Sequence, residues 1–465
     1  LFFISRRLSM HIHILGICGT LMGSIALLAK AQGHTITGSD DGVYPPMSDQ
    51  LHQEGIALQS PYRRDSIPGA ADLVVLGNAG LGRGNPAVEA LLSSGTEFCS
   101  GAEFLGRFIL KDKWVIAVSG THGKTTTASM ITWILECAGL NPGYLIGGIP
   151  TNFERSARLT ESPFFVIEAD EYDTSFFDRQ SKFLHYHPRT LVLNNLEFDH
   201  ADIFADLTAI EDQFHQLIRR VPASGLIISN SQDNNIETLL KRGVWSEQLR
   251  FGVISDQDPQ PPGGLSMHQP SQLISLAGAR LGTLNWGLTG VHNLSNALAA
   301  LAAARHVGVP PEQGIESLAD FTGVKRRMEI VHVSPKAILY DDFAHHPTAI
   351  KSTLAGLRQK IGQAPLYAIL EPRSHTMRLG IHQDQLAPAC VHADRVFWLK
   401  PERLAFDLDK AVSPQGHSVF DDPLTLAHAV GQQLGLERSN AHIVIMSNGG
   451  IDVLKNALLD QISHA

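Results

Sequence analysis

The segment Gly120-Thr121-His122-Gly123-Lys124-Thr125-Thr126-Thr127 constrains the fold of this chain most. An apolar run at 114–118 precedes it and predicts a buried strand, and residues 128–135 predict a helix. A glycine-rich turn between strand and helix that ends in Gly-Lys-Thr is typical of a phosphate-binding loop. Strict loops of this kind carry a glycine five residues before Gly123, where this chain has Val118, so the loop is a variant. We therefore expect the chain to bind a nucleoside triphosphate.

Side chains of this loop and of two later strand ends indicate a magnesium site. Lys124 is expected to reach the terminal phosphates, and the Thr125 hydroxyl to ligate Mg²⁺. Glu168 follows a predicted strand at 164–167 and opens a run of four carboxylates. A carboxylate beside a phosphate loop commonly holds Mg²⁺, which favours a metal ligand over a solvated acidic turn. His200 follows the next strand, 190–193, and is either a second ligand, an orienting group or a structural histidine.

The composition excludes several classes of protein. A chain of 465 residues with 43% hydrophobic and 18% charged residues indicates two to four soluble globular domains. Its net charge of −9 argues against a broad nucleic-acid-binding surface. No apolar stretch approaches the roughly 20 residues that span a bilayer. The four cysteines, at positions 18, 99, 137 and 390, show no paired spacing, so a reducing compartment, the cytoplasm, is expected.

Strands and helices alternate in three blocks, which predicts an α/β fold of three domains, each an open and mainly parallel sheet with helices. We expect a Rossmann-like domain at 10–112, a central P-loop domain at 113–322 and a second Rossmann-like domain at 323–465, after an upstream extension at 1–9. Residues 255–272 are rich in Pro, Gly, Gln and Asp and predict a loop. The expected strands are 11–15, 35–37, 72–76, 114–118, 164–167, 190–193, 226–228, 337–340, 366–370, 395–398 and 443–446.

Polar residues near the second domain boundary suit a nucleotide. Asn293 and Asn296 lie one turn apart in a predicted helix, where their amides can bind an adenine edge, although Asn293 can equally cap the helix. Arg326 lies at the boundary and can clamp a γ-phosphate, while Asp342 can hold ribose hydroxyls. His346 belongs to a histidine pair that lacks the second Cys or His pair of a zinc module.

Two further segments suggest substrate contacts. Gly16 and Gly19 follow the first strand, and Asp40 follows a later one, which weakly resembles a dinucleotide-binding pattern and equally suits another nucleotide diphosphate. Arg373 and Arg378 lie in a loop after the strand 366–370, and two guanidinium groups there can receive a substrate that carries carboxylates. The alternative reading of this second segment is a solvated turn.

In their order, these motifs resemble those of the Mur ligase family, the ATP-dependent amide-forming enzymes of peptidoglycan metabolism. The resemblance extends over nearly the whole chain from Met10 and rests on 120–127, 168–173, 194–200, 292–296, 325–327 and 341–347. It implies ATP and Mg²⁺ as cofactors and a reaction through an acyl phosphate. The implied ATP contacts are Gly120, Thr121, His122, Gly123, Lys124, Thr125, Thr126, Asn293, Asn296, Arg326 and Asp342. The implied metal ligands are Thr125, Glu168 and His200, and the implied catalytic groups are Lys124, His200, Arg326 and His346.

The start of the chain, His-Ile-Leu-Gly-Ile-Cys-Gly, resembles the branches of the family that act on UDP-N-acetylmuramate. There the first domain holds the UDP group, which implies contacts at Gly16, Gly19, Met22, Ser39, Asp40 and Asn78. The segments 340–350 and 371–378 resemble the branch that joins UDP-N-acetylmuramate to the tripeptide L-alanyl-γ-D-glutamyl-meso-diaminopimelate during peptidoglycan recycling. That resemblance assigns Arg373, His375 and Arg378 to the peptide, although asparagine is expected at position 375.

One absence supports this placement within the family. Other branches use a carbamylated lysine in the central domain, and the chain has no lysine between Lys182 and Lys241, where it would fall. Three alternatives remain open: ligation of L-alanine in place of the tripeptide, a P-loop regulatory NTPase that uses no sugar nucleotide, and an NAD-dependent oxidoreductase. The glycine-rich first domain argues against the NTPase, and the phosphate loop argues against the oxidoreductase.

Overall fold

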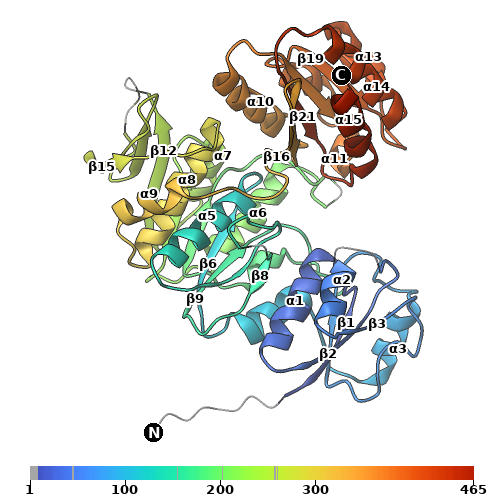
Figure 1. Cartoon of the computed structure of the whole chain (residues 1–465). Helices are drawn as coiled ribbons and strands as arrows, with labels where there is room; N and C mark the ends of the chain where they lie inside the picture. The colour runs from blue at the N-terminus through green and yellow to red at the C-terminus, as the bar shows by residue number, and fades with distance from the viewer. Residues whose placement is uncertain are drawn as a thin grey trace.

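The computed structural model describes residues 9–43, 47–153, 155–201, 203–255, 258 and 260–464. Three separate sheets, each with its own helices, form three domains, and the first and third domains lie apart, each against the central one (Figure 1). The expected α/β class with three mainly parallel sheets is therefore confirmed. Apart from Ser9, the predicted upstream extension lies outside the described residues.

The first domain is a five-stranded sheet in the order β3-β2-β1-β4-β5, with every neighbouring pair parallel. The strand order reverses at β1, which pairs with β2 on one side and with β4 on the other. Ligands of open α/β sheets collect beyond the carboxyl ends of strands at such a reversal. Its strands are β1 (His11–Leu15), β2 (Thr35–Ser39), β3 (Ala57–Gln59), β4 (Leu73–Leu76) and β5 (Phe98–Ser100). Its helices are α1 (Thr20–Ala31), α2 (Met47–Gln53), α3 (Pro86–Ser94), α4 (Gly101–Phe104) and a π-helix at Leu105–Ile109.

The central domain carries a ten-stranded sheet in the order β15-β14-β13-β12-β11-β10-β6-β9-β7-β8. Its strands are β6 (Trp114–Ser119), β7 (Gly143–Leu145), β8 (Ala157–Arg158), β9 (Phe164–Glu168), β10 (Thr190–Leu193), β11 (Leu226–Asn230), β12 (Glu247–Ile254), β13 (Leu265–His268), β14 (Leu273–Leu276) and β15 (Ala279–Thr283). The parallel strands β9 and β10 flank β6, and the register pairs Val118 with Glu168 and Ser119 with Leu193. The predicted phosphate loop and both predicted metal-binding segments therefore leave the sheet side by side.

Two helices of the central domain bring distant segments to this edge. They are α5 (Lys124–Cys137) and α8 (Val291–His306), and the others are α6 (Leu207–Ile218), α7 (Asn234–Lys241) and α9 (Pro311–Ala319). Residues Ala297–Ala304 of α8 are all buried, and the short alanine side chains allow α8 to pack closely on α5. Close packing of the two helices places Asn296 beside the phosphate loop, more than 170 residues away in sequence.

The predicted loop at 255–272 is wrong in part. Residues Leu265–His268 form β13, which pairs in parallel with β12 and antiparallel with β14. Its sequence, Leu-Ser-Met-His, alternates apolar and polar residues over only four positions and contains no apolar run, although three of the four residues are buried. The surrounding Pro and Gly residues consequently dominated the sequence pattern.

The third domain has six strands in the order β16-β17-β21-β18-β19-β20, and only β16 is antiparallel to its neighbour. They are β16 (Glu329–Val333), β17 (Ala337–Asp342), β18 (Leu366–Leu370), β19 (Arg395–Leu399), β20 (Ser418–Phe420) and β21 (Ala441–Met446). Its helices are α10 (Pro347–Ile361), α11 (His375–Arg378), α12 (Gln383–Ala389), α13 (Leu408–Val412), α14 (Pro423–Leu436) and α15 (Asp452–His464). Because β17, β21 and β18 are neighbours, the polar segments that follow them converge on one edge.

No helix among the described residues is long and apolar enough to cross a membrane. The predicted domain boundaries at 112/113 and 322/323 fall between the three sheets and stay predictions.

Candidate functional site

The phosphate loop has the backbone that its sequence predicts. Gly120 and Gly123 have φ angles of 135° and 78°, in the region that favours glycine. A Cβ at Gly120 would lie 2.9 Å from the Asn195 carbonyl oxygen, and a Cβ at Gly123 would lie 2.5 Å from Asn296 Oδ1. Both glycines are therefore required by conformation and by space. Asn195 holds the loop in turn, because its carbonyl and side-chain oxygens accept the Thr121 and His122 amides at 3.1 and 2.7 Å.

The start of α5 presents free backbone donors to this loop. The Thr127 amide donates to the Gly123 carbonyl, so intrahelical bonding begins there and the amides of residues 124–126 have no partner within the helix. Together with the helix dipole, these amides create a positive potential at the helix N-terminus. The local structure is thus suited to binding an anion such as a phosphate.

Lys124 lies in a cluster of carboxylates. Its ammonium donates to the Gly120 carbonyl at 2.7 Å and lies 3.3 Å from Glu171 and 3.6 Å from Asp170. Burial alone lowers the pKa of Lys124, but Glu171, Asp170 and Glu168 outweigh burial and raise it. The lysine is therefore fully charged at neutral pH and is held in the loop, where it is available to a phosphate.

Thr125 and Glu168, two of the predicted metal ligands, are in direct contact. The Thr125 hydroxyl donates to Glu168 Oε1 at 2.9 Å, and the Gly147 amide donates to Glu168 Oε2 at 2.7 Å. Burial and the nearby Asp170 raise the pKa of Glu168, although Lys124 opposes the rise. A cation beside Glu168 would relieve the cost of its buried negative charge, so this pair of oxygen ligands fits Mg²⁺.

His200, the third predicted ligand, reaches the same cluster through Glu171. Its Nε2 lies 3.3 Å from Glu171 Oε1 and 3.8 Å from Asp199 Oδ2, and its ring packs on Tyr172 at 4.3 Å between centroids. Burial alone lowers the pKa of His200, but the hydrogen bond to Glu171 and the charge of Asp199 raise it. These contacts favour the protonated imidazole, and binding a metal through this nitrogen would require it to leave Glu171.

The arginine that contacts the phosphate loop is Arg327. Its Nη2 lies 3.5 Å from Thr125 Oγ1, whereas Arg326, predicted for this role, donates to the carbonyls of Ser447 and Gly449 at 2.8 and 2.9 Å. Arg326 also pairs with Asp341 at 3.4 Å, so this guanidinium binds within its own domain. Burial lowers the pKa of Arg327, although nearby carboxylates oppose the shift. In this conformation the structure brings Arg327, not Arg326, to the phosphate loop.

The remaining predicted ATP contacts are divided between the loop and its surroundings. Asn296 is buried against Gly123, while the Asn293 side chain donates through Nδ2 to the Thr289 carbonyl at 2.7 Å and so fixes the start of α8. Asp342 is buried, and its two oxygens accept the Met328 and Ala344 amides at 2.8 Å each. Asp342 thus shapes the backbone around Arg327.

A seam between the central and third domains crosses this site. Thr376 of α11 is buried, and its hydroxyl oxygen accepts the Ala201 amide at 3.3 Å and donates to Asp199. Asp199 also lies 4.0 Å from His345 Nε2. His346, the N-cap residue of α10, lies 3.4 Å from Glu197. The loops after β10, β17 and β18 therefore meet around the metal-binding segment.

The predicted peptide contacts lie at the edge of this seam. Arg373 is half exposed, lies 3.6 Å from Glu371 and donates to the Gly450 carbonyl at 3.3 Å. His375 and Arg378 are the first and last residues of α11, whose N-terminus is capped by Ser374. Thr376 lies between His375 and Arg378. The same short helix therefore carries two of the three peptide candidates and contacts the loop of His200.

Some of the predicted UDP contacts are accessible to a ligand and others are buried. Gly16, Gly19, Asp40 and Asn78 are at least partly exposed, whereas Met22 and Ser39 are buried. Gly16, with φ of 81°, and Gly19 form the turn before α1, and Asp40 holds that turn by accepting the Cys18 amide at 2.8 Å. Ser39 is completely buried, and its hydroxyl bonds His13 at 3.0 Å. Met22 packs under Gly77 and Gly101 and supports the same turn. Asn78 donates to Asp173 of the central domain at 2.6 Å, so it links the two domains.

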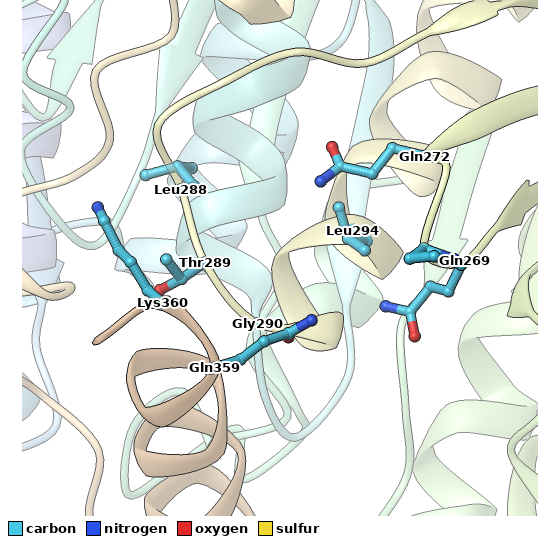
Figure 2. A pocket seen from close by; sticks show the side chains of 10 residues that line it. Gln269, Gln272, Leu288, Thr289, Gly290, Leu294, Gln359 and Lys360 are labelled. Atoms are coloured by element: carbon cyan, nitrogen blue, oxygen red, sulfur yellow. The ribbon is translucent and has the colours of Figure 1, made fainter. Parts of the chain in front are cut away.

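A separate cavity of about 170 Å³ lies at another part of the seam, between the start of α8, residues 269–272 and the end of α10 (Figure 2). Gly356 of α10 packs directly on Gly290 there, and Figure 2 shows Lys360 and Gln359 on the α10 side. None of the predicted site residues lines this cavity. The predicted catalytic and metal-binding residues lie around the phosphate loop and the seam beside it, not at this cavity.

Sequence patterns missed several residues of the site. Glu171 belongs to the recognised acidic run, but the run does not show which carboxylate meets Lys124. Arg327 adjoins the predicted Arg326, and no pattern separates two neighbouring arginines. Glu197, Asp199 and Thr376 act across the seam, and no sequence signal predicts a contact between loops about 175 residues apart.

Models of one protein family match all three domains. The model described as "Mur ligase family, catalytic domain" matches residues 11–113, "Mur ligase middle domain" matches 118–304, and "Mur ligase, glutamate ligase domain" matches 326–449.

Individual proteins are similar to this chain over most of its length. The chain is 49% identical over 459 residues to the Escherichia coli (strain K12) UDP-N-acetylmuramate–L-alanyl-gamma-D-glutamyl-meso-2,6-diaminoheptandioate ligase, which covers 98% of each chain. It is 32% identical over 390 residues to the UDP-N-acetylmuramate–L-alanine ligase of Acetivibrio thermocellus, covering 83% of this chain and 80% of that one. The crystal structure of a murein peptide ligase from Psychrobacter arcticus matches with a TM-score of 0.73 and 41% identity, covering 98% and 99%.

Proposed function

Because the chain belongs to the Mur ligase family, we propose that it joins UDP-N-acetylmuramate to the tripeptide L-alanyl-γ-D-glutamyl-meso-diaminopimelate at the expense of ATP. The carboxylate of the muramyl lactyl group and the amino group of the tripeptide would form the new amide. The reaction belongs to peptidoglycan recycling. Ligation of L-alanine is the nearest alternative, and a regulatory NTPase is an alternative of another class.

One observation carries this proposal. The relative named for the tripeptide reaction is 49% identical and aligned over 98% of both chains, whereas the relative named for L-alanine is 32% identical over 83% of this chain. With 98% of this chain covered, the alignment to the tripeptide ligase takes in the third domain, where the peptide candidates Arg373, His375 and Arg378 lie. The similarity therefore favours the tripeptide over the single amino acid.

The residues at the phosphate loop fit the Mg²⁺ that this chemistry uses. Thr125 and Glu168 would hold the cation, with His200 nearby, because oxygen ligands suit Mg²⁺ and burial together with Asp170 raises the pKa of Glu168 despite the charge of Lys124. Bound there, Mg²⁺ would neutralise charge on the phosphates of ATP.

The chain's own groups would then stabilise phosphoryl transfer. A carboxylate is a poor acyl donor, so its oxygen first takes the γ-phosphoryl group of ATP and ADP leaves. Lys124 and Arg327 converge on the phosphate loop and supply positive charge to the transferring group. The peptide amine attacks the carbonyl carbon of the acyl phosphate, the C–O bond to phosphate breaks, and the amine nitrogen loses a proton.

His200 and His346 differ in what they can contribute. The carboxylates around His200 raise its pKa, so this imidazole is suited to stabilising negative charge. Burial lowers the pKa of His346 to about 3, so it stays neutral and is a weak proton acceptor. We therefore assign no general base for the amine, and positioning with exclusion of water carries the second step.

The expected substrates and location complete the proposal. The first domain, 10–112, would hold the UDP group through the Gly16–Gly19 turn and Asn78, and the third domain, 323–465, would hold the tripeptide. Cys18, Cys99, Cys137 and Cys390 are free cysteines, which suits a reducing compartment, and we propose that the enzyme acts in the cytoplasm.

The first experiment is to measure ADP release by the purified chain with ATP, Mg²⁺ and UDP-N-acetylmuramate, supplying L-alanine and the tripeptide in separate reactions. Turnover with the tripeptide alone is expected, and the Lys124→Ala variant serves as the inactive control. Turnover with L-alanine alone would replace the proposal with the biosynthetic reaction. ADP release without either amine or sugar nucleotide would indicate a regulatory NTPase.

A further inference from the structure

Three side chains from two domains meet at the seam outside the predicted magnesium ligands. His122 lies in the phosphate loop, Glu197 follows β10, and His346 is the N-cap residue of α10 in the third domain. One carboxylate oxygen, Glu197 Oε2, lies 3.2 Å from His122 Nε2 and 3.4 Å from His346 Nδ1. The three atoms all lie within 4.8 Å of one another, and the two rings are 4.8 Å apart between centroids.

These separations match the first shell of a small divalent cation. Bonds of about 2.0–2.2 Å at tetrahedral angles place neighbouring ligand atoms roughly 3.3 Å apart. Both contacts of Glu197 have that length, and the wider distance between the two imidazoles can close by a small movement of the third domain. Two imidazoles with one carboxylate are a common protein ligand set for zinc.

The contacts of His346 Nδ1 leave two acceptor atoms facing one another. Its Nδ1 lies 3.3 Å from the Thr348 amide, which would donate to it, yet the same nitrogen faces the carboxylate oxygen of Glu197. With Nδ1 accepting, two acceptor atoms face one another at 3.4 Å and the proton lies on Nε2. His346 is only 5% exposed, and its buried Nε2 has no hydrogen-bond partner among the described residues. With Nδ1 protonated, the Thr348 amide loses its acceptor.

The contact that a cation would change is the facing pair of acceptors, His346 Nδ1 and Glu197 Oε2, because Nε2 stays without a partner whether or not an ion is bound at Nδ1. A cation between Nδ1 and Glu197 would turn the facing pair of acceptors into two ligands. The weak hydrogen bond from the Thr348 amide is the contact that metal binding would displace.

The protonation states of two of these groups suit a metal. Burial alone raises the pKa of Glu197, but the contacts of this carboxylate, led by the hydrogen bond from His122, outweigh burial and lower the pKa to about 2. Burial lowers the pKa of His346 to about 3. At neutral pH the carboxylate is ionised and the His346 imidazole keeps its lone pair, so neither group needs to lose a proton when a cation binds.

We propose that His122, Glu197 and His346 form a transition-metal site, suited to Zn²⁺, that links the phosphate loop to the third domain. The site differs from that of Mg²⁺ in its ligands, because it presents nitrogen where Thr125 and Glu168 present oxygen. It also extends across the seam, so an occupied site would hold the third domain against His122, two residues before Lys124. Zinc binding would consequently stabilise this arrangement of the two domains.

The test is a titration of the full chain with Co²⁺, followed by displacement with Zn²⁺, in the presence of excess Mg²⁺ and without nucleotide. We expect one ion per chain with the visible absorption of four- or five-coordinate Co²⁺. The Glu197→Gln variant keeps the shape of the side chain and should bind at least about tenfold more weakly, as should His122→Asn. His382→Ala is the matched control, because the His382 ring lies 4.6 Å from that of His346 and supplies no ligand. It should retain the wild-type affinity.

Crystals soaked in Zn²⁺ give a second, independent readout, since anomalous scattering locates the ion. A peak between His122, Glu197 and His346 is the expected result. Equal Co²⁺ affinity of the wild type and Glu197→Gln would overturn the proposal, because binding would then come from other histidines. A peak confined to Glu168 and His200, or no specific binding, would overturn it as well.

Discussion

At the scale of single residues, the phosphate loop shows how neighbouring side chains acquire different roles. Arg326 and Arg327 are adjacent, yet one binds carbonyls of the third domain and the other reaches Thr125. Neighbouring residues in an irregular segment point in different directions, and Arg326 has a φ angle of 59°. The backbone at 326–328 therefore decides which guanidinium faces the nucleotide.

The first prediction separates these two arginines. Arg327→Ala should lower kcat for ADP release by about 10²-fold or more, because one positive donor to the transferring phosphoryl is lost. Arg326→Ala should instead lower stability, since the buried Asp341 and two carbonyls lose their donor. Steady-state kinetics and urea denaturation of both variants measure the difference. A larger loss of kcat in the Arg326 variant would restore the original assignment.

A second prediction concerns the tripeptide. Arg378→Ala should raise the KM for the tripeptide roughly ten- to a hundredfold while leaving the KM for ATP unchanged, because a charge-assisted hydrogen bond to a substrate carboxylate is lost. Arg438→Ala is the matched control, since Arg438 is exposed and precedes β21, at the opposite edge of the sheet. A normal KM for the tripeptide in the Arg378 variant would contradict the peptide assignment.

The third prediction follows from the pKa of Glu171. Lys124 and His200 lower this pKa from 4.5 to about 2 against the effect of burial. The folded state therefore binds protons less readily than the unfolded state, and the resulting stabilisation is present above pH 4.5 and disappears as the pH falls towards 2. The difference between the two pKa values corresponds to on the order of 3 kcal/mol.

Urea denaturation at several pH values checks this expectation. Glu171→Gln should be less stable than the wild type near neutral pH, and the gap should shrink between pH 4.5 and 2. Asp170→Asn is the comparison, because Asp170 is more exposed and lies farther from Lys124. A gap that does not depend on pH would mean that packing, not charge, explains the loss.

At the scale of helices and strands, caps fix the loops that carry the site. Asp233 caps α7 by accepting the Asn235 and Ile236 amides at 3.0 Å each, and its other oxygen accepts the Leu196 amide at 2.9 Å. Leu196 precedes Glu197, Asp199 and His200. One carboxylate thus anchors both a helix and the segment that leads to the metal site.

The fourth prediction uses this double role. Asp233→Ala should cost about 1–2 kcal/mol of stability, from the lost cap, and should also lower kcat because the segment 196–200 loses its anchor. Asp206 is the matched control, since it caps α6 through Ala209 alone. Asp206→Ala should show a similar loss of stability with normal kcat. Equal kcat values in the two variants would refute the anchoring role of Asp233.

At the scale of the whole molecule, contacts between domains complete the site. Asn78 joins the first domain to Asp173, Thr376 joins the third domain to Ala201 and Asp199, and Gly290 packs on Gly356 near the cavity of Figure 2. The first and central domains share one continuous apolar core, which includes Phe104 and Phe183, whereas the third domain has core clusters of its own. The third domain can therefore part from the central one without exposing a core. Substrates of three kinds can then enter and be enclosed before the reactive acyl phosphate forms.

The fifth prediction tests the seam through Thr376. Thr376→Val removes the hydroxyl but keeps the shape, so the Ala201 amide and Asp199 each lose a hydrogen bond. We expect kcat to fall about three- to tenfold, in line with one or two hydrogen bonds of ordinary strength. Thr376→Ser keeps the hydroxyl and should retain activity. Normal kcat in the valine variant would show that this contact does not contribute to the reactive arrangement.

The sequence by itself determined the elements and their chemistry. Every strand predicted from its apolar run exists, because buried parallel strands require continuous apolar residues. β13 was not predicted because Ser266 and His268 interrupt its apolar residues and Pro and Gly surround it. The phosphate loop was recognisable because its glycines are required by backbone geometry within eight consecutive residues.

Only the tertiary structure decided which groups meet. The contacts of Lys124 with Glu171, of Thr125 with Arg327 and of Glu197 with His346 join segments that are 47 to 202 residues apart. Their distances depend on how three sheets and their helices pack, and local sequence carries no record of that packing. The shifts in the pKa values of these groups depend on burial and on charged neighbours, so the shifts too arise only in the folded chain.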